Sequence, residues 1–411
     1  MEKETFTPGE LDEVVRHLHQ AIVTHPHDAQ SRYEMGRIYS YRQDYRKAIR
    51  YYKTALAIDP QHTGALRYIG LAYACLGDYG GAFGYFRQAL DVDPDEPEAH
   101  FQMGCTYEAV KDVQEAIRCF RRTIELAPDH ALSYGHLGLL LFGQQDYAGA
   151  LACFQQAARL DSASDATYTN MGAVWARLKN SEEARRCFER ALELNPANVA
   201  AYYNMGNSYN DEKAPVEAQR WFRKALELDP DCMPARAGLG LSYDLLKDYN
   251  EAVGWFLKAL EASPDNVLLL TLVGMDYVEL ERYREALAYW QKAVALDPGN
   301  SRARKMEAAT YYYLEEFPKA LDRFHKALEL DPDDPWTLCA IGKIYCGLED
   351  YERARIYLQK TMALDPNDAE AVMLIGQCYE AQGNHREANR FYKRAARMGN
   401  EDAQEKLRTR C

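Results

Sequence analysis

A proline recurs every 34 residues along most of this chain. Starting at Pro26, every 34th residue is proline as far as Pro366, with Ser162 as the one exception. No insertion or deletion interrupts the count. A fixed period of this length means that one supersecondary unit is stacked many times. The period therefore predicts one repeat array, whereas 411 residues would otherwise suggest two or three globular domains.

Other positions keep the same period. Numbered so that Pro60 is position 32, eleven repeats fill residues 29–402. Position 20 is alanine in all eleven repeats, position 8 is glycine in ten, with Ala308 as the exception, and position 24 is aromatic in ten. Apolar residues at positions 4, 7, 8 and 11, and at 17, 20, 21, 24 and 27, form two helical stripes. Each repeat is therefore expected to be a pair of antiparallel helices, a first and a second helix, in an all-α solenoid.

Capping signals set the expected helix ends and the domain organisation. Asp or Asn at position 16 is an N-cap for the second helix, and the position-32 proline stops it. We expect residues 1–28 to form an N-terminal arm and a half-repeat capping helix that starts after Thr7, and residues 29–402 to form eleven repeats. Residues 403–411 would complete a C-terminal capping helix that begins near residue 401. Four repeats add glutamate three residues after the cap, as in a capping box: Asp112/Glu115, Asn180/Glu183, Asp248/Glu251 and Asn384/Glu387.

These residues resemble the tetratricopeptide repeat. That family's signature is a large residue at position 4, Leu-Gly at 7–8, Tyr at 11, Ala at 20, an aromatic residue at 24, Ala at 27 and Pro at 32. The resemblance implies a right-handed superhelix whose concave groove is lined by the first helices and usually binds peptides or protein segments. It implies that positions 2, 5, 9, 12 and 13 line this groove, with position 6 beside them.

Composition limits the partners. The net charge of −13 argues against binding a nucleic-acid backbone, which needs a basic face. No run of apolar residues is long enough for a transmembrane helix, and the start of the chain has no apolar signal-peptide core. We therefore expect a cytoplasmic protein. No phosphate-binding loop, nucleophile elbow or zinc-protease motif is present, so we expect neither catalysis nor a cofactor.

The expected groove residues change in character along the chain. An apolar patch in repeats three and four is followed by small side chains and one cation in repeat five, an amide-rich patch in repeat six and a basic-aromatic patch in repeats nine and ten. The apolar patch is Phe101, Leu132, Leu139 and Phe142, and the cation is Arg177. The amide patch is Tyr203, Asn204, Asn207 and Asn210, and the basic-aromatic patch is Arg302, Lys305, Tyr312, Trp336 and Lys343.

Each patch has an alternative interpretation. Asn207 and Asn210 lie on one helix face, where their amides would bond both sides of an extended peptide; otherwise they are solvated. The basic-aromatic patch would grip a carboxylate or an acidic aromatic peptide through charge-assisted hydrogen bonds and cation–π contacts. Otherwise its charges are solvated and Trp336 packs between repeats.

Two further features carry expectations. The ten cysteines show no zinc spacing and are expected to be free thiols, with Cys119, Cys153 and Cys187 aligned on the outer face at position 23. Glu307 replaces the usual core leucine of repeat nine. A buried carboxylate is costly unless paired, so either the helix rotates there or Glu307 meets a cation.

The sequence thus predicts a non-enzymatic scaffold or adaptor that binds an unidentified protein or peptide in the concave groove. One alternative is a structural subunit that self-associates or contacts neighbours through its convex face. Another is the recognition subunit of a separate enzyme. The convex alternative rests on aromatic residues at position 23: Tyr51, Tyr85, Trp221, Trp255, Tyr289, Tyr357 and Phe391.

Overall fold

The computed structural model describes residues 8–408, and every regular element in that range is an α-helix. The first helices are each 13 residues long and begin 34 residues apart. They are α2 (Ala29–Tyr41), α4 (Thr63–Cys75), α6 (Pro97–Ala109), α8 (Ala131–Gly143), α10 (Asp165–Arg177), α12 (Val199–Asp211), α14 (Met233–Leu245), α16 (Val267–Glu279), α18 (Ser301–Tyr313), α20 (Pro335–Gly347) and α22 (Ala369–Ala381).

The second helices alternate with the first and keep the same period. They are α3 (Tyr45–Leu56), α5 (Tyr79–Val92), α7 (Val113–Leu126), α9 (Tyr147–Leu160), α11 (Ser181–Leu194), α13 (Pro215–Leu228), α15 (Tyr249–Ala262), α17 (Tyr283–Leu296), α19 (Phe317–Leu330), α21 (Tyr351–Leu364) and α23 (His385–Arg397). Two further helices flank them, α1 (Pro8–Thr24) and α24 (Glu401–Arg408). The predicted N-cap Thr7 lies outside the described residues.

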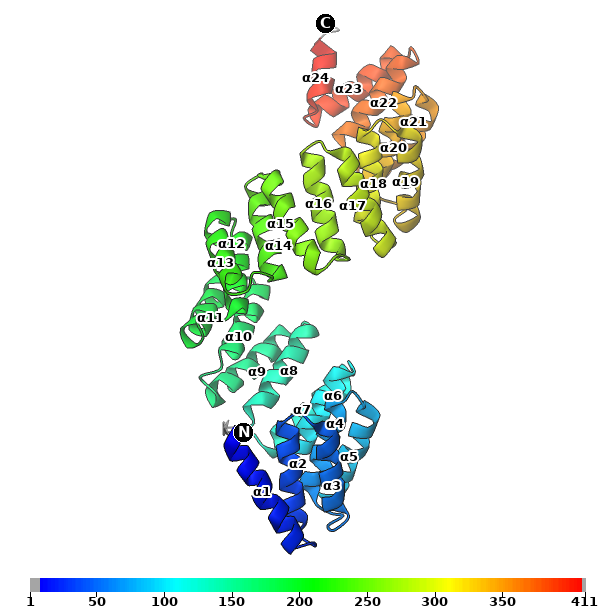
Figure 1. The fold of residues 1–411 in the computed structure, drawn as a ribbon. Helices are drawn as coiled ribbons and strands as arrows, with labels where there is room; N and C mark the ends of the chain where they lie inside the picture. Colours follow the sequence, from blue (N-terminus) through cyan, green and yellow to red (C-terminus); the bar gives the residue numbers. More distant parts are fainter. Residues whose placement is uncertain (1–7, 409–411) are drawn as a thin grey trace. The chain divides into compact units, whose positions relative to one another are not determined.

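The chain divides into two compact units, one ending at Ala201 and the other starting at Tyr202, so that the boundary falls inside α12. Within each unit the two helices of a repeat pack against each other, and each pair packs against the next pair along the chain (Figure 1). This arrangement, in which each helix pair stacks on the neighbouring pairs along the chain, is an α-solenoid, as the period predicts.

Glycine at position 8 makes room for the ring at position 24. A Cβ built on Gly104 would lie 2.8 Å from Phe120, and one built on Gly206 would lie 2.7 Å from Phe222. These rings are fully buried. The glycine therefore admits an aromatic side chain between the paired helices, in addition to bringing their backbones close.

The predicted caps are formed. The side chains of Asp112, Asn180, Asp248 and Asn384 each accept a hydrogen bond from the backbone N–H three residues later. The turn before each of these caps needs a left-handed residue, which is Lys111 (φ 64°) before Asp112 and Gly383 (φ 77°) before Asn384. Only glycine adopts this conformation without strain, so the lysine is held there by the two helices that it joins.

The buried acid of repeat nine is paired. Glu307 is 2% exposed, and its Oε1 lies 3.3 Å from Nε of Arg323 on the neighbouring second helix. Of the two alternatives for Glu307, the ion pair is the one that the structure contains. Burial still raises the pKa of the Glu307 carboxyl, although Arg323 opposes the rise.

The position-23 cysteines of repeats three to five are largely covered by their surroundings. Cys119 and Cys187 are buried, and Cys153 is half-buried. Their side chains are small enough to be covered by neighbouring helices, where the larger rings at the same position elsewhere stay half-exposed. The described cysteines are all free thiols.

Candidate functional site

The amide patch lies on α12 in the C-terminal unit. Tyr203, Asn204 and Asn207 are half-buried, and neither asparagine side chain makes a hydrogen bond to another described residue. Burial raises the pKa of the Tyr203 hydroxyl, so this side chain is a neutral donor and acceptor at physiological pH. The two asparagine amides and the tyrosine hydroxyl thus keep their hydrogen-bonding capacity.

Asn210 behaves differently, which corrects the expectation that its amide is free. Its Nδ2 donates to the carbonyl oxygen of Gly238 at 3.1 Å, and its Oδ1 accepts from the hydroxyl of Ser242 at 2.9 Å. Both partners belong to α14, so Asn210 joins the first helices of two neighbouring repeats. Asn207 and Asn210 therefore do not form the pair of free amides that their spacing suggested.

The Asn210–Ser242 contact belongs to a recurring register. It joins position 12 of one repeat to position 10 of the next, and the same register brings Asp244 close to Asp276 and Cys346 close to Cys378. The two sulfur atoms of the cysteine pair lie 3.3 Å apart. Spacing within a single helix could not reveal these pairs, because the partners lie 32 residues apart on adjacent first helices.

Asp276 is the most perturbed acid among the described residues. It is 3% exposed, and its Oδ2 has no hydrogen-bond partner. Burial, together with the nearby carboxylate of Asp244, raises the Asp276 pKa to about 8. Glu279 adds a further repulsive charge from the same helix. Asp276 therefore carries a proton over much of the physiological pH range.

Two cations of the basic-aromatic patch already have acidic partners. The Lys305 ammonium lies 3.2 Å from Asp334, and the Lys343 ammonium lies 2.6 Å from Glu370. Asp334 is the N-cap of the following first helix, α20, and Glu370 lies in the first turn of α22. The net positive charge expected for this patch is therefore largely neutralised, and a carboxylate ligand would have to replace a partner that is already present.

The rest of the patch is more open. Arg302 is exposed, and its guanidinium contacts only the sulfur of Met275, at 3.1 Å, among the described residues. Trp336 is 49% exposed and meets the buried ring of Phe324 edge-on. Tyr312 is half-buried against Phe317. Arg302 and Trp336 are thus the members of the patch with free surface for a ligand.

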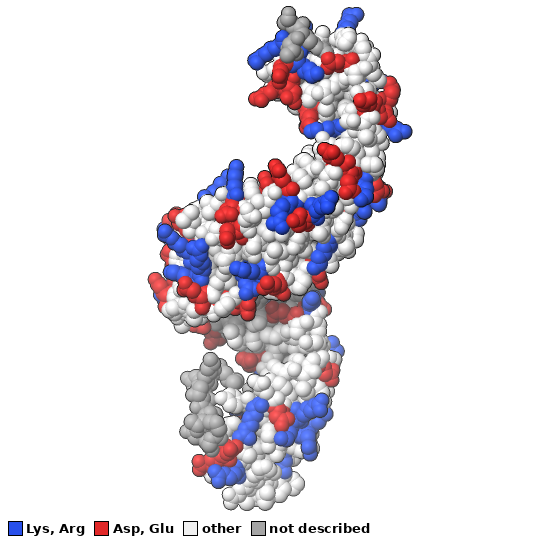
Figure 2. Space-filling model, turned by 45° about the horizontal axis from the view of Figure 1, so that its top comes forward, with Lys and Arg blue, Asp and Glu red and all other residues white. Residues whose placement is uncertain are grey.

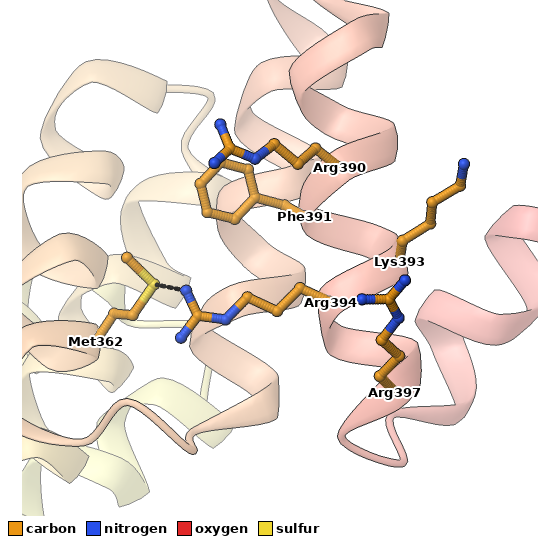
Figure 3. A pocket seen from close by; sticks show the side chains of 6 residues that line it. All are labelled: Met362, Arg390, Phe391, Lys393, Arg394 and Arg397. Atoms are coloured by element: carbon orange, nitrogen blue, oxygen red, sulfur yellow. Dashed lines mark hydrogen bonds between the residues drawn. The ribbon is translucent and has the colours of Figure 1, made fainter.

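Charged side chains on the visible surface are intermixed, with acidic and basic groups close together (Figure 2). One hollow on the second helices departs from this pattern (Figure 3). It is lined by Met362 of α21 and by five residues of α23: Arg390, Phe391, Lys393, Arg394 and Arg397. We call it the α23 hollow. The sequence analysis missed it because each of these cations is ordinary by itself.

The apolar patch lies in the N-terminal unit. Leu132 is 63% exposed and Leu139 is 42% exposed, both on α8. Phe101 and Phe142 are half-buried, and Phe101 packs against Phe120 and two histidine rings. The leucines therefore carry most of the accessible apolar surface. Arg177 is exposed at the end of α10.

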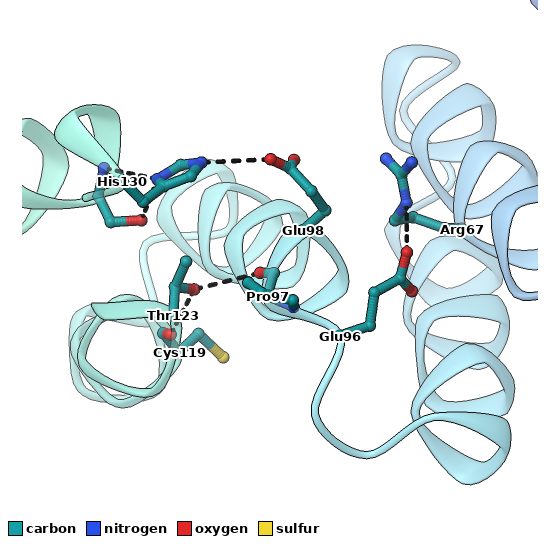
Figure 4. Close-up of polar contacts among 8 residues, drawn as sticks. Arg67, Glu96, Pro97, Glu98, Cys119, Thr123 and His130 are labelled. Atoms are coloured by element: carbon teal, nitrogen blue, oxygen red, sulfur yellow. Dashed lines mark hydrogen bonds and ion pairs between the residues drawn. The ribbon is translucent and has the colours of Figure 1, made fainter. Parts of the chain in front are cut away.

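Two acid–base contacts join neighbouring first helices of the N-terminal unit near their starts (Figure 4). Nε of Arg67, in the first turns of α4, donates at 2.9 Å to the carboxylate of Glu96, the N-cap of α6. His130 accepts the N–H of Ser133 at Nδ1, which leaves the proton on Nε2, 3.3 Å from Glu98. His130 also packs against Phe101, so its contact with Glu98 adjoins the apolar patch.

The convex aromatic residues are engaged in packing. Tyr51 stacks on Tyr39, and Tyr289 stacks on Tyr277, with ring centroids 5.3 and 5.6 Å apart. The position-23 rings at Tyr85, Tyr357 and Phe391 make the same contact with the position-11 ring of their own repeat. All seven rings of the predicted stripe are half-buried. Much of the stripe therefore covers its own helix pairs.

No three His, Cys, Asp or Glu side chains among residues 8–408 are arranged to hold a metal ion. None of the helices described is both long enough and apolar enough to cross a membrane.

Comparison with known families gives matches along most of the chain. Tetratricopeptide repeat families match residues 35–103, 101–165, 166–198, 199–232 and 217–267. The middle TPR-like domain of cilia and flagella-associated protein 70 matches residues 270–399. No curated protein sequence gives a significant match.

Solved structures include similar folds. A human IFIT1 dimer with m7Gppp-AAAA is 14% identical, and the match covers 97% of each chain with a TM-score of 0.51. YrrB, described as a TPR protein with an unusual peptide-binding site, is 30% identical over 45% of this chain and 95% of its own, with a TM-score of 0.42. MamA is 26% identical over 39% of this chain and 95% of its own, with a TM-score of 0.38.

The repeat matches, which together cover more than half of the chain, agree with the stacked helix pairs. They support a protein-interaction scaffold in general terms. This chain belongs to the tetratricopeptide repeat family.

Proposed function

We propose that this protein is a non-enzymatic adaptor that binds extended segments of partner proteins on the surface formed by its first helices. The observation that carries this proposal is the distribution of exposed apolar side chains. Large apolar residues that remain exposed without a structural reason are typical of interaction surfaces.

Half of the exposed large apolar residues between Pro8 and Arg408 have a structural reason, since they recur at positions 14 and 30, beside the turns of most repeats. Most of the others lie at positions 2, 9 and 13 of first helices, the positions that line the family's groove. They are Tyr41, Leu132, Leu139, Leu245, Leu268, Tyr313 and Trp336. Because these residues do not recur from repeat to repeat, the fold alone does not account for them.

In the C-terminal unit, the proposed contacts combine hydrogen bonding with one free cation. The Asn207 amide and the Tyr203 hydroxyl would bond the backbone of an extended segment, and Asn204 lies beside them. Arg302 would bind a carboxylate and Trp336 would pack on an apolar or aromatic side chain. Asn210 would act indirectly, by holding α12 against α14.

Lys305 and Lys343 have a different proposed role. Each is already paired with an acid, so a partner carboxylate would exchange with Asp334 or Glu370. Exchange of one ion pair for another adds little affinity, but it penalises partners that bring a positive charge. These lysines would therefore contribute selectivity.

In the N-terminal unit, the proposed contact is apolar. Leu132 and Leu139 would cover the apolar side chain of a partner, with Phe142 beside them and Arg177 on the next first helix. Burying about 100 Å² of apolar surface contributes about 2.5 kcal/mol. We also propose that the protein works in the cytoplasm, where its free thiols would stay reduced.

The experiment compares partner capture by the wild-type chain and by Tyr203→Ala/Asn207→Ala. Asn210 is left intact because its loss would loosen the packing of neighbouring repeats. The matched control is Glu217→Ala/Arg220→Ala, two exposed residues on the second helix of the same repeat. We expect the α12 variant to lose a partner that the wild-type chain and the control retain. Equal capture by all three proteins, or loss only in the control, would overturn the proposed site.

A further inference from the structure

The α23 hollow has an unusual charge pattern for a chain with a net charge of −13. Arg390, Lys393, Arg394 and Arg397 follow the spacing i, i+3, i+4, i+7, which places them along one face of a helix. All four side chains are exposed. Arg390 and Arg394 extend toward α21, where Met362 lies (Figure 3).

These cations have few anionic partners. Among the described residues, Arg390 meets only Glu387, at 3.5 Å, and Lys393 and Arg397 make no hydrogen bond or ion pair. Arg394 donates to the carbonyl oxygen of Pro366 at 3.0 Å and contacts the sulfur of Met362 at 3.4 Å. Within residues 8–408, the hollow therefore carries a concentrated positive charge in which only Arg390 has an acidic partner.

An equivalent helix of the same chain provides an internal comparison. In repeat three, α7 carries arginines at the positions of Arg390, Lys393 and Arg394, but acids surround two of them. Arg118 pairs with Glu115, and Arg122 pairs with Asp95 at 2.6 Å and with Glu125 at 3.0 Å; the third arginine is Arg121.

Both of the acids that hold Arg122 are missing around α23. The position of Asp95 is taken by Asn367, and the position of Glu125 is taken by Arg397. In repeat eight, the corresponding lysine also has an aspartate at the Asp95 position, since Lys292 lies 3.4 Å from Asp265. Repeats three and eight thus each hold this cation with an aspartate from the preceding repeat, whereas repeat eleven has Asn367 at that position.

We propose that the α23 hollow binds an acidic segment of a partner protein, with clustered carboxylates on the four cations and an apolar side chain against Met362 and Phe391. This surface lies on second helices and is separate from the first-helix surface proposed above. Arginine clusters are a common means of recognising acidic peptide motifs, because guanidinium groups bind carboxylates through paired hydrogen bonds.

The dimensions favour an extended peptide. Seven residues of helix separate Arg390 from Arg397, which corresponds to about 10 Å along the axis. An extended peptide covers that length with about three residues. A single small anion could contact only part of the row, and the acidic charge of the whole chain opposes an extended phosphate backbone or an anionic membrane.

The test uses a short fluorescein-labelled peptide with glutamates at alternate positions around a central leucine, and its glutamine counterpart. Binding to the full chain is followed by fluorescence anisotropy at low and at high salt. We expect the glutamate peptide to bind, the glutamine peptide to bind poorly and high salt to weaken binding. Arg394→Ala/Arg397→Ala should reduce affinity by about tenfold, because two of the charge-assisted contacts are lost.

Two further variants make the test specific. Arg121→Ala/Arg122→Ala on α7 removes the same total charge and should leave the affinity unchanged. Asn367→Asp supplies the missing acid without removing a cation and should weaken binding by pairing with Arg394. The first-helix variant Tyr203→Ala/Asn207→Ala should bind the peptide normally, so the two proposals can fail separately.

Three results would overturn the proposal. The α7 and α23 variants could bind the glutamate peptide equally, which would indicate nonspecific attraction. Asn367→Asp could bind as tightly as the wild-type chain. Anionic lipid vesicles or a single-stranded oligonucleotide could bind through Arg394 and Arg397 while the glutamate peptide does not, which would assign the hollow to another class of ligand.

Discussion

The buried carboxyl of Asp276 makes the stability of the C-terminal unit depend on pH. It lies on α16, is 3% exposed and faces Asp244 of α14, with Glu279 and Tyr249 also nearby. Its pKa rises from the ordinary value of 3.8 to about 8. Between these two values, the folded chain holds a proton that the unfolded chain releases. Stability contributed by the protonated form is therefore lost as the pH rises through this window.

The expected magnitude follows from the linkage relation. One proton bound only in the folded state changes the free energy of unfolding by about 1.4 kcal/mol per pH unit. Raising the pH from about 5.5 to about 7.5 should therefore destabilise the helices around Asp276 by about 2–3 kcal/mol. Asp276→Asn removes this dependence, because the amide cannot ionise and can donate to Asp244. The variant should be more stable than the wild-type chain at the higher pH.

Native-state hydrogen exchange is the appropriate assay, since a repeat array need not unfold in one step. Opening free energies for amides of α14–α16 are compared at the two pH values after correction for intrinsic exchange. The matched control is Asp333→Asn, which alters an exposed carboxylate on a turn. The reasoning is refuted if Asp276→Asn keeps the wild-type pH dependence, or if the wild-type chain shows none.

Three further predictions concern packing, charge and thiol chemistry. Gly104→Ala should destabilise the chain by about 1–3 kcal/mol, because the added Cβ would lie 2.8 Å from a buried ring. A Cβ at Gly84 would meet open space, so Gly84→Ala should stabilise the chain by about 1 kcal/mol. Urea unfolding measures both changes. Arg323→Ala should cost about 2–3 kcal/mol by leaving the buried acid of repeat nine unpaired, and a thermal shift no larger than that of a surface arginine would contradict this. Hydrogen peroxide should join Cys346 and Cys378 in a disulfide. One thiol is oxidised to a sulfenic acid with release of water, and the other thiol then displaces a second water to form the disulfide. Mass spectrometry should find the chain lighter by two hydrogens, and Cys346→Ser should not show this product.

The thiol prediction rests on the hydrogen bond between the two side chains. The two thiols share one hydrogen bond, which lowers the pKa of the Cys378 thiol and raises that of Cys346. Cys346 is half-buried, so peroxide can approach the pair from its side. An intermolecular disulfide formed in preference to this pair would show that the two sulfur atoms do not stay in contact.

The fold could be predicted from the sequence because the same local signals occur eleven times in one register. Gly104 and Phe120 occupy positions whose roles are evident from their recurrence, and Asp112 caps its helix as its position indicates. The division into a capping helix, eleven repeats and a closing helix stays our proposal.

The candidate sites were harder to predict because they depend on contacts between neighbouring repeats. The sequence placed Asn210 on an accessible helix face, but only the register between adjacent helices shows that Ser242 and Gly238 use its amide. For the same reason, the partners of Lys305 and Lys343 could not be identified from spacing within one helix. A periodic sequence identifies the structural role that one position has in every repeat, whereas binding depends on the residues at which a repeat departs from the pattern.

Site-specific photocrosslinking tests the central claim most directly. A photoreactive amino acid is placed at Leu139 or Asn207 on first helices, and at Glu189 on a second helix as the matched exposed control. Each protein is irradiated in native extract, and its adducts are identified by mass spectrometry. The account predicts a partner protein crosslinked from a first-helix position and absent from the control. Adducts formed from Glu189, with none from Leu139 or Asn207, would contradict it.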